Sequence, residues 1–311
     1  MISLIKNSKL SYAFFNIFNR KKLKHNLPLY KKYNLNKSYF TPISSKDFKD
    51  LETQFLRREN PGAIAETVFF KNQTEENQQS LLHYFDKGYS IIRNFITDEQ
   101  ADQINLEIQT LLDNKQIEFK YGNKLMFALH KSEIIKKIGL EKSLLELLDV
   151  LMDGKTKLFQ SINFINGSQQ KTHSDSIHMT TFPLGGLVGV WIALEDVTAE
   201  QGALHYYPGS HRLPYYMNSD YDNDGNFWML GNKGYKGYEE MLEHKVKEQN
   251  LKKEVFECKK GDMLIWHANI LHGGEPHTNK NKTRKSMVFH FFDENSVCYH
   301  EITQRPALFE N

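Results

Sequence analysis

From Gly88 onward, the hydrophobic positions of the chain follow the spacing of regular secondary structure. Residues 89–93 (Tyr-Ser-Ile-Ile-Arg) predict a short strand. Thr97, with Gln100 three residues later, predicts a capping box at the start of a helix. A second helix is predicted over 143–152, where five leucines provide a broad apolar surface. The apolar residues that recur on one face of the first helix are Ile104, Ile108, Leu111 and Leu112.

The pattern changes after Gly154. Short runs rich in β-branched and aromatic residues are now separated by turn residues such as Asn166-Gly167 and Pro208-Gly209. Because no helices alternate with these runs, they predict an antiparallel barrel or jelly roll. The predicted fold class is therefore mainly β with flanking helices. The runs predicted as strands cover residues 157–165, 186–194, 203–207, 254–258, 262–267 and 286–292.

Residues 215–253 interrupt this series of strands. The segment is first polar and aromatic, and then has the period of a helix around Tyr238 and Leu242. An insertion of this length in a compact barrel is more often a lid or a binding loop than a linker. Its aromatic residues, with glycines at 225, 231, 234 and 237 that permit hinging, predict a lid over the substrate. The alternative is a surface excursion whose aromatic side chains pack on the barrel.

The first 46 residues differ in charge from the rest of the chain. They contain ten of the 40 Lys and Arg residues and none of the 38 Asp and Glu residues. Their apolar residues are interleaved with polar ones, which is compatible with an amphipathic helix. Three interpretations are open: a helix that binds a membrane surface or an anionic partner, a cleaved organellar presequence, or an extension that packs on the domain. Only one of the ten basic residues is arginine, which is weak support for a presequence, and we favour the packed extension.

Composition excludes several classes of protein. The formal net charge of +2 lacks the basic excess of a dedicated nucleic-acid binder. Two cysteines, Cys258 and Cys298, are too few for a disulfide scaffold, a Cys-rich zinc module or an iron–sulfur cluster. The densest apolar run, residues 187–194, is far shorter than the roughly 18 residues that cross a bilayer. These features predict a soluble, cytoplasmic protein.

The segment Thr172-His173-Ser174-Asp175-Ser176 carries the clearest chemical signal. Residues i and i+2 of an extended chain point to the same side, so His173 and Asp175 are aimed at one point. A further histidine from a distant strand would complete a face of two histidines and one carboxylate. This face is typical of non-haem Fe(II) oxygenases and leaves metal positions open for O2 and a co-substrate. Downstream, His272 follows a predicted strand, and Arg284 could pair bidentately with the far end of a dicarboxylate co-substrate.

Taken together, these motifs resemble the phytanoyl-CoA dioxygenase family of Fe(II)- and 2-oxoglutarate-dependent oxygenases, which includes ectoine hydroxylase. The resemblance is weak before Gly88 and absent across 215–253. It covers roughly residues 88–292 and implies a double-stranded β-helix, a cupin-like jelly-roll barrel. The predicted domains are a basic extension (1–46), a helical or irregular lead-in (47–87) and the oxygenase domain (88–311). The resemblance rests on His173-Ser174-Asp175, Trp191 to Asp196, Gln201 to Leu204, Pro208 to His211, and Gly261-Asp262 through His272 and Arg284.

The resemblance also implies roles for individual residues. By position, it makes His173, Asp175 and His272 the ligands of Fe(II). Arg284 matches the arginine that holds the distal carboxylate of 2-oxoglutarate. Two further positions, Asn163 and Trp191, fall where relatives place residues at the co-substrate.

The implied reaction is hydroxylation of an aliphatic C–H bond in a small-molecule metabolite. O2 and 2-oxoglutarate are the co-substrates, ascorbate is a supporting reductant, and succinate and CO2 are products. The carboxylate of Asp175 disfavours halogenation, because related halogenases have a small residue there. Gly274 stands where some relatives have a serine that contacts 2-oxoglutarate, so this chain lacks that hydroxyl.

Two other classes of function are considered. One is a cupin-type metal-binding protein, acting as an isomerase or a sugar-binding module without O2; Arg284 and the lack of a fourth ligand argue against it. The other is a catalytically silent scaffold for the basic arm, which has no need for an intact set of site residues. Among the remaining histidines, we expect His267 in the pocket or core, His211 bonded to the backbone of its turn, His178 either facing substrate or structural, and His205, His277 and His290 structural.

Overall fold

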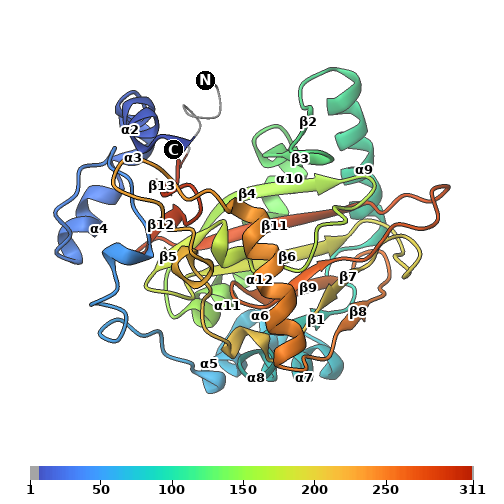
Figure 1. The fold of residues 1–311 in the computed structure, drawn as a ribbon. Coiled ribbons are helices and arrows are strands. Elements are labelled where there is room, and N and C mark those ends of the chain that lie inside the picture. Colours follow the sequence, from blue (N-terminus) through green and yellow to red (C-terminus); the bar gives the residue numbers. More distant parts are fainter. Residues whose placement is uncertain (1–6, 310–311) are drawn as a thin grey trace.

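The computed structural model describes residues 7–309, in which one long antiparallel sheet is flanked by two short sheets and by helices (Figure 1). The strand order is β1-β9-β6-β11-β4-β3-β2 in the long sheet, and β10-β7-β8 and β13-β12-β5 in the short sheets. The strands are β1 (Tyr89–Ile92), β2 (Phe119–Lys120), β3 (Lys124–Met126), β4 (Thr156–Phe164), β5 (Thr180–Phe182), β6 (Leu187–Ala193), β7 (Leu204–Tyr206), β8 (Glu254–Phe256), β9 (Met263–His267), β10 (His272–Gly274), β11 (Ser286–Asp293), β12 (Val297–His300) and β13 (Arg305–Pro306).

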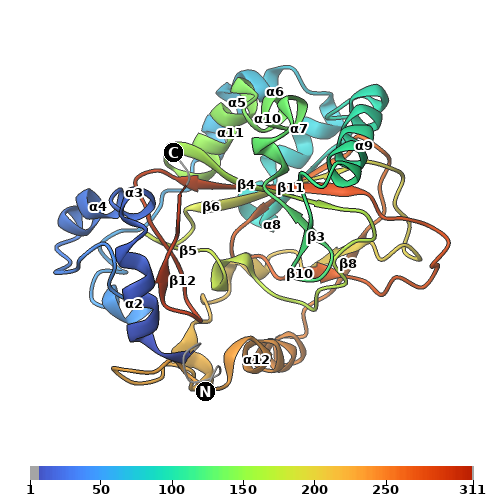
Figure 2. The same cartoon turned by 90° about the horizontal axis from the view of Figure 1, so that it is seen from above.

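The helices gather mostly on one side of the long sheet (Figure 2). Helices α5, α6, α7, α9, α10 and α11 cover that face, and the short sheets and α12 lie toward the other. The α-helices are α2 (Lys9–Ile17), α3 (Arg20–Leu23), α4 (Asn26–Lys32), α5 (Pro61–Glu66), α6 (Val68–Lys71), α7 (Glu75–Leu82), α8 (Tyr84–Lys87), α9 (Asp98–Asp113), α10 (Glu133–Gly139), α11 (Lys142–Met152) and α12 (Gly234–Glu248). Short 3-10 helices are η1 (Ser45–Asp47), η2 (Ala128–His130), η3 (Asp175–Ile177), η4 (Ser210–Arg212) and η5 (Asn218–Tyr221).

Two hydrophobic layers lie on opposite faces of the long sheet. Val190 and Phe289 belong to the layer beneath the helices, whereas Trp191 and Val288 belong to the layer between the sheets. Alternate residues of one strand thus enter different layers, as the pleat requires. This two-layered arrangement of antiparallel strands is that of a jelly roll, which confirms the predicted fold class.

The predicted elements from Gly88 onward are present, with ends that move by one or two residues. The capping box forms as expected: Thr97 Oγ1 accepts from the Gln100 amide, and Gln100 Oε1 accepts from the Thr97 amide. The helix predicted over 143–152 begins one residue earlier, where the Glu141 carboxylate caps it. The strands β2, β3, β5, β10, β12 and β13 were not predicted from the sequence.

The N-terminal segment packs on the short sheet formed by β13, β12 and β5. Tyr30 and Tyr33 are buried in a cluster with Phe182 and Tyr299, and the Ile43 amide donates to the carbonyl of Gln304. Of the residues that suggested an amphipathic helix, those at positions 2, 4 and 5 lie outside the described residues. Between residues 7 and 309, no helix combines the length and the apolar character needed to cross a bilayer.

The insertion at 215–253 contains η5 and the predicted helix, which is α12. Its loop is bonded to the N-terminal segment: the Lys9 amide donates to Trp228 O, and the Leu230 amide donates to Asn7 O. Gly225 and Gly231 are packed against backbone, where an added Cβ would stand within 2.2 Å and 2.1 Å of the nearest atoms. Close packing therefore explains these two glycines.

Candidate metal centre

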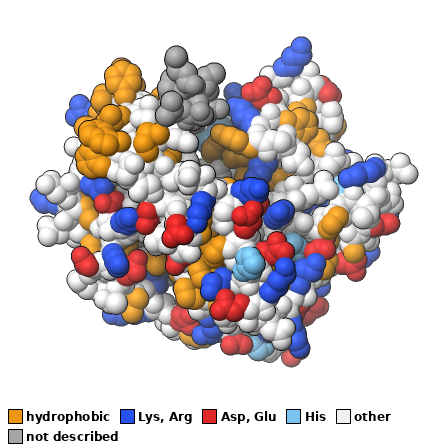
Figure 3. Space-filling view, viewed as in Figure 1, with side chains coloured by type: hydrophobic (Ala, Val, Ile, Leu, Met, Phe, Trp, Pro, Cys, Tyr) orange, Lys and Arg blue, Asp and Glu red, His pale blue; other side chains and the backbone are white. Residues whose placement is uncertain are grey.

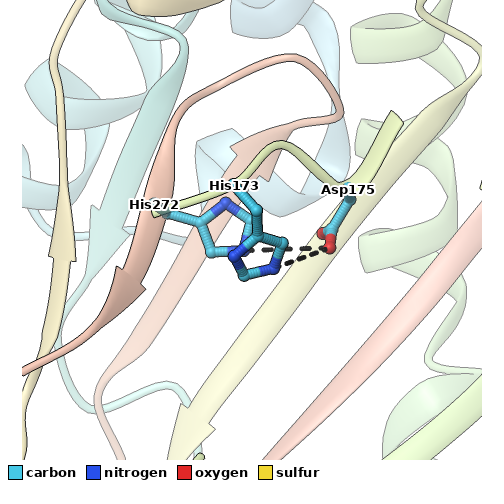
Figure 4. A group of neighbouring side chains, drawn as sticks. All are labelled: His173, Asp175 and His272. Carbon is cyan, nitrogen blue, oxygen red and sulfur yellow. Dashed lines mark ion pairs between the residues drawn. The ribbon is translucent and has the colours of Figure 1, made fainter. Parts of the chain in front are cut away.

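The structure brings His173, Asp175 and His272 together (Figure 4). One ligand atom from each lies within 4.8 Å of the others, and all three side chains are buried. His173 follows β4 in an extended segment, Asp175 opens η3, and His272 opens β10. His173 and His272 form an isolated antiparallel bridge, in which each amide donates to the other's carbonyl at 2.8 Å. The expected strand geometry is therefore replaced at Asp175 by a 3-10 turn, which aims its carboxylate at the two imidazoles.

Backbone carbonyls fix the tautomer of both histidines. His173 Nδ1 lies 2.8 Å from Lys171 O, and His272 Nδ1 lies 3.1 Å from Ile270 O. Because a carbonyl can only accept, Nδ1 carries the hydrogen in each ring, and the lone pair of Nε2 faces Asp175 Oδ1 at 3.8 Å. Burial, reinforced by His272, lowers the pKa of His173 well below its ordinary value. The imidazole is therefore neutral, the form that binds a metal ion.

The second oxygen of Asp175 is held by two residues that the sequence did not reveal. Trp266 Nε1 donates to Oδ2 at 2.8 Å, and His290 Nε2 lies 3.3 Å from the same atom. His290 Nδ1 is 3.1 Å from Gln160 Nε2, a donor, so Nε2 carries the hydrogen that faces the carboxylate. Burial alone would raise the pKa of Asp175, but His272 and His290 outweigh it and hold the pKa well below its ordinary value. The expectation that His290 is merely structural is therefore incomplete.

Sheet register explains this arrangement. Trp266, Gly189, His290 and Gln160 lie side by side across β9, β6, β11 and β4. A Cβ at Gly189 would stand 2.3 Å from the Trp266 ring, so the missing side chain is what leaves room for the indole. In the sequence, the only sign that the Trp266 ring packs this closely on β6 is that a glycine, Gly189, stands within a buried strand.

The three residues open into a cavity of ≈ 980 Å³. Its inner part is lined by Trp191, Arg284 and Lys124, and its outer part by residues from α2, β12, β13 and α12. Asp175 is the only carboxylate among the described residues that line it. Burial lowers the pKa of Lys124, against the opposing charge of Asp175. The cavity therefore has a cationic inner wall around the two histidines and Asp175.

Arg284 and Trp191 have polar atoms without partners in the described structure. Arg284 is 2% exposed, its Nε has no hydrogen-bond partner, and Nη1 reaches only Ser286 Oγ at 3.4 Å. Its guanidinium lies 5.1 Å from the Trp191 ring, whose Nε1 is also unpartnered. Burial lowers the pKa of Arg284 to about 10, so the group remains cationic at neutral pH. A buried cation with free donors is a site for an anionic ligand.

Asn163 lies on the wrong face of the sheet for the predicted contact with the co-substrate. Its cross-strand neighbours are Met287 and Leu125, which belong to the layer beneath the helices. It lines a separate, smaller pocket with Asn105, whereas Ile162 lines the large cavity. The pleat of β4 therefore directs Asn163 away from Arg284, and the structure does not bring it into the candidate site.

Of the other histidines discussed above, some line the large cavity and others make contacts outside it. His178 lines the cavity and lies 3.4 Å from His300 through their ring nitrogens; burial, with His300, lowers its pKa to about 3. His267 is half-buried beside Tyr215 and His211 and does not line the large cavity, which agrees with the core alternative better than with the pocket one. His211 Nε2 lies 3.1 Å from Phe85 O, as expected for a histidine bonded to backbone, although the partner belongs to α8 and not to its own turn. His205 pairs with Glu275, and His277 Nδ1 lies 3.3 Å from Asn166 O.

Comparison with known families decides the family of this chain. The family described as phytanoyl-CoA dioxygenase (PhyH) matches residues 84–286, about two thirds of the chain and all of the segments that carry the metal-binding group. The chain belongs to the phytanoyl-CoA dioxygenase family. The predicted resemblance is thereby confirmed.

Curated relatives and solved structures extend this result. Phytanoyl-CoA dioxygenase domain-containing protein 1 of Danio rerio is 27% identical over 56% of this chain and 59% of its own length. The Dictyostelium discoideum homologue of that protein is 24% identical over 71% of this chain and 93% of its own length. The non-haem α-ketoglutarate-dependent carbocyclase SnoK from nogalamycin biosynthesis has the same fold, with a TM-score of 0.58 and 16% identity over 73% of this chain and 87% of that one. EctD from S. alaskensis, solved with 2-oxoglutarate and 5-hydroxyectoine, has a TM-score of 0.53 and 14% identity over 76% of this chain and 83% of that one.

Proposed function

We propose that this protein is an Fe(II)- and 2-oxoglutarate-dependent oxygenase that hydroxylates an aliphatic C–H bond of a small molecule. One observation carries the proposal: His173, Asp175 and His272 open into the same cavity as the buried, unpartnered guanidinium of Arg284. Two imidazoles and one carboxylate suit Fe(II) and leave metal positions free. The free donors of Arg284 suit the distal carboxylate of 2-oxoglutarate. When bound, iron and 2-oxoglutarate would supply the oxidation by O2, with release of succinate and CO2.

The residues of the chain would act by holding and shielding these groups. His173 and His272 offer Nε2, with Nδ1 tied to backbone, so neither ring can rotate without losing a hydrogen bond. Asp175 offers Oδ1, while Trp266 and His290 hold Oδ2. Trp191 covers the guanidinium of Arg284 and keeps water from it. Such a preorganised and dry site favours charged ligands over solvent.

Ser168 provides a hydroxyl near the position where Gly274 lacks one. Its Oγ would stand 3.3 Å from a Cβ at residue 274, and it lines the cavity. The nearby backbone nitrogen of Gln169 would be only 3.0 Å from that Cβ, so a side chain at 274 would be crowded. We assign the missing contact with 2-oxoglutarate to Ser168.

The substrate would bind in the outer part of the cavity, beyond the metal. Its lining includes the apolar side chains of Phe127, Phe159 and Met179 and the polar pair His178 and His300. From the insertion, Tyr235 lines the cavity, with its hydroxyl accepting from Gln170 Nε2 at 2.9 Å. We therefore keep residues 215–253 as the proposed lid, with Tyr235 as its contact with the substrate.

The decisive experiment measures succinate from 2-oxoglutarate under Fe(II), ascorbate and O2 against a panel of metabolites. We expect one metabolite to raise succinate formation and to gain one oxygen atom. Asp175→Ala should lose bound Fe(II) and all substrate-dependent succinate while still unfolding in one cooperative transition, compared with wild type in the absence of metal. His267→Gln, a change at a half-buried histidine outside the cavity, should keep bound Fe(II). Full turnover in Asp175→Ala would contradict the assignment, and turnover of a metabolite without O2 or succinate would favour the cupin-type isomerase.

A further inference from the structure

Helix α2 has its apolar side chains on the outside. A surface helix normally turns its apolar face to the core. In α2 the one buried side chain is Asn16, and Tyr12 and Ala13 are partly buried, whereas the leucine, isoleucine and phenylalanine side chains of the helix and its C-cap are between 44% and 75% exposed. These residues are Leu10, Phe14, Phe15, Ile17 and Phe18, and we call them the α2 patch. Figure 3 shows hydrophobic side chains gathered over α2 at the top of the molecule, beside a hollow in the surface.

The α2 patch is continuous with the mouth of the large cavity. Phe15 belongs to both, since it is 54% exposed and also lines the cavity. Across the mouth, exposed Tyr121 and Phe127 line the cavity near β2 and β3, and Leu308 does so beside β13. The opening is therefore framed by apolar side chains from separate parts of the chain, which a monomer in water does not require.

The exposed residues directly after α2 are basic. Residues 1–46 contain ten basic and no acidic residues. Arg20, Lys21 and Lys24 follow directly on α2 and are exposed, and no carboxylate within the described part of the chain forms an ion pair with them. Lys37 and Lys46, by contrast, pair with Asp47 and Asp224. An apolar helix face next to unpaired cations is the pattern of a segment that lies in a lipid–water interface.

We propose that α2 docks this protein on an anionic lipid surface, with the mouth of the cavity facing the lipid. Phe14 and Phe18, whose rings lie 5.3 Å apart edge to face, enter the acyl boundary, while Arg20, Lys21 and Lys24 meet the headgroups. A second copy of the chain fits the α2 patch less well than an anionic lipid surface does. A two-fold interface would place the basic segment of one copy against that of the other, and such like charges repel.

The first test measures co-sedimentation with phosphatidylcholine vesicles and with vesicles that also contain phosphatidylserine. Wild type should bind the phosphatidylserine vesicles, and salt should weaken the binding. Phe14→Ser/Phe18→Ser and Lys21→Glu/Lys24→Glu should each reduce the binding by on the order of tenfold or more. The matched controls Leu106→Ser, at a residue 69% exposed on α9, and Lys252→Glu, at an exposed position before β8, should bind as wild type does. Because neither Phe14 nor Phe18 lines the cavity, this readout is independent of the proposed oxygenase activity.

The second test reports which side of the molecule meets the lipid. Phe18→Cys, Tyr121→Cys and Leu106→Cys are labelled with a dye whose emission shifts in an apolar environment; Cys258 and Cys298 are buried and should not react. The dyes at 18 and 121 should shift on phosphatidylserine vesicles, and the dye at 106 should not. Equal vesicle binding by wild type and Phe14→Ser/Phe18→Ser would overturn the proposal. The proposal would also be overturned if wild type does not bind vesicles and instead forms a dimer that Phe14→Ser/Phe18→Ser abolishes. The α2 patch would then bind a second copy of the chain.

Discussion

Trp266 donates its indole hydrogen to Oδ2 of Asp175 across 2.8 Å, from a strand ninety-one positions further along the chain. This bond orients the carboxylate so that its other oxygen, Oδ1, faces both histidines at 3.8 Å. The indole itself is seated over Gly189, where no Cβ could be accommodated. The direction of a metal ligand thus depends on a glycine in a strand that contributes no ligand.

Trp266→Phe should weaken metal binding and preserve the fold. The ring volume is largely kept, but Oδ2 loses its strongest donor, and such outer partners typically contribute about 10–100-fold to metal affinity. Titration of the metal-free protein with Fe(II) under anaerobic conditions measures this effect. Trp228→Phe, at an exposed tryptophan, is the control and should bind as wild type does. Unchanged affinity in Trp266→Phe would show that His290 alone orients the carboxylate.

Arg284→Leu should have opposite effects on ligand binding and on stability. Loss of a charge-assisted pair costs about 1.5–3 kcal/mol, so the affinity for 2-oxoglutarate should fall about tenfold or more. In the absence of 2-oxoglutarate, however, Arg284 is a buried cation with unpartnered Nε, and leucine avoids that desolvation cost. The ligand-free variant should therefore unfold at an equal or higher urea concentration. If affinity for 2-oxoglutarate is unchanged, Lys124 on the same wall holds that carboxylate, and Lys124→Met is the variant that tests it.

Asp293→Asn should make the free energy of unfolding less dependent on pH in the acid range. The Asp293 carboxylate accepts from Arg57 Nη2 at 2.8 Å and from the amides of Lys155 and Asn295 at 3.1 Å. Burial alone would raise the pKa of Asp293, but Arg57 outweighs it and holds the pKa below its ordinary 3.8. The carboxylate therefore stabilises the fold above pH 3.8, and this contribution is lost as the pH falls through the lowered pKa.

Urea unfolding of both proteins over a series of pH values measures this contribution. At neutral pH the variant should be less stable by roughly 3 kcal/mol, since Arg57 keeps its hydrogen bonds to Leu184 O and Ser296 Oγ but loses its anionic partner. The difference should shrink in acid, where wild-type Asp293 is protonated. Asp222→Asn, which removes an exposed pair with Lys233, should change stability by about 1 kcal/mol or less. A difference that is constant with pH would show that the carboxylate acts through its shape and not its charge.

If 215–253 is a lid, substrate should change its hydrogen exchange together with that of α2. The backbone bonds of Trp228 and Leu230 to Lys9 and Asn7 tie the two segments, so closure must move them as a unit or break these bonds. With 2-oxoglutarate and a redox-inert divalent metal present, substrate should add protection around residues 227–237 and alter it around 8–10. Equal exchange with and without substrate would mean that the insertion is structural.

The sequence was sufficient for the parts of the fold that depend on local patterns. The capping box at Thr97 and the strands β4, β6, β9 and β11 follow from side-chain type and spacing alone. It was insufficient where two faces of a strand are equally buried. The second half of β4 is buried on both sides, so the alternation that would place Asn163 is not visible in its composition.

In the candidate site, too, some residues could be assigned from the sequence and others could not. His173, Asp175 and His272 were assigned correctly as a cluster because their spacing and order are properties of the chain. The roles of Trp266 and His290 depend on which strands become neighbours, and β9, β6 and β11 pair out of chain order. The outward apolar face of α2 also depends on tertiary context, since the same residues would suit a helix packed on the core.

The bridge between His173 and His272 has a consequence for the energetics of folding. Two segments about a hundred residues apart in sequence are hydrogen-bonded to each other through backbone groups alone. The entropy of closing that long loop is therefore lost when the chain folds and not when a metal arrives. A metal bound by both rings would act as a reversible cross-link across this loop, much as a disulfide would in an oxidising compartment. Its concentration would then set the resistance of the whole barrel to unfolding.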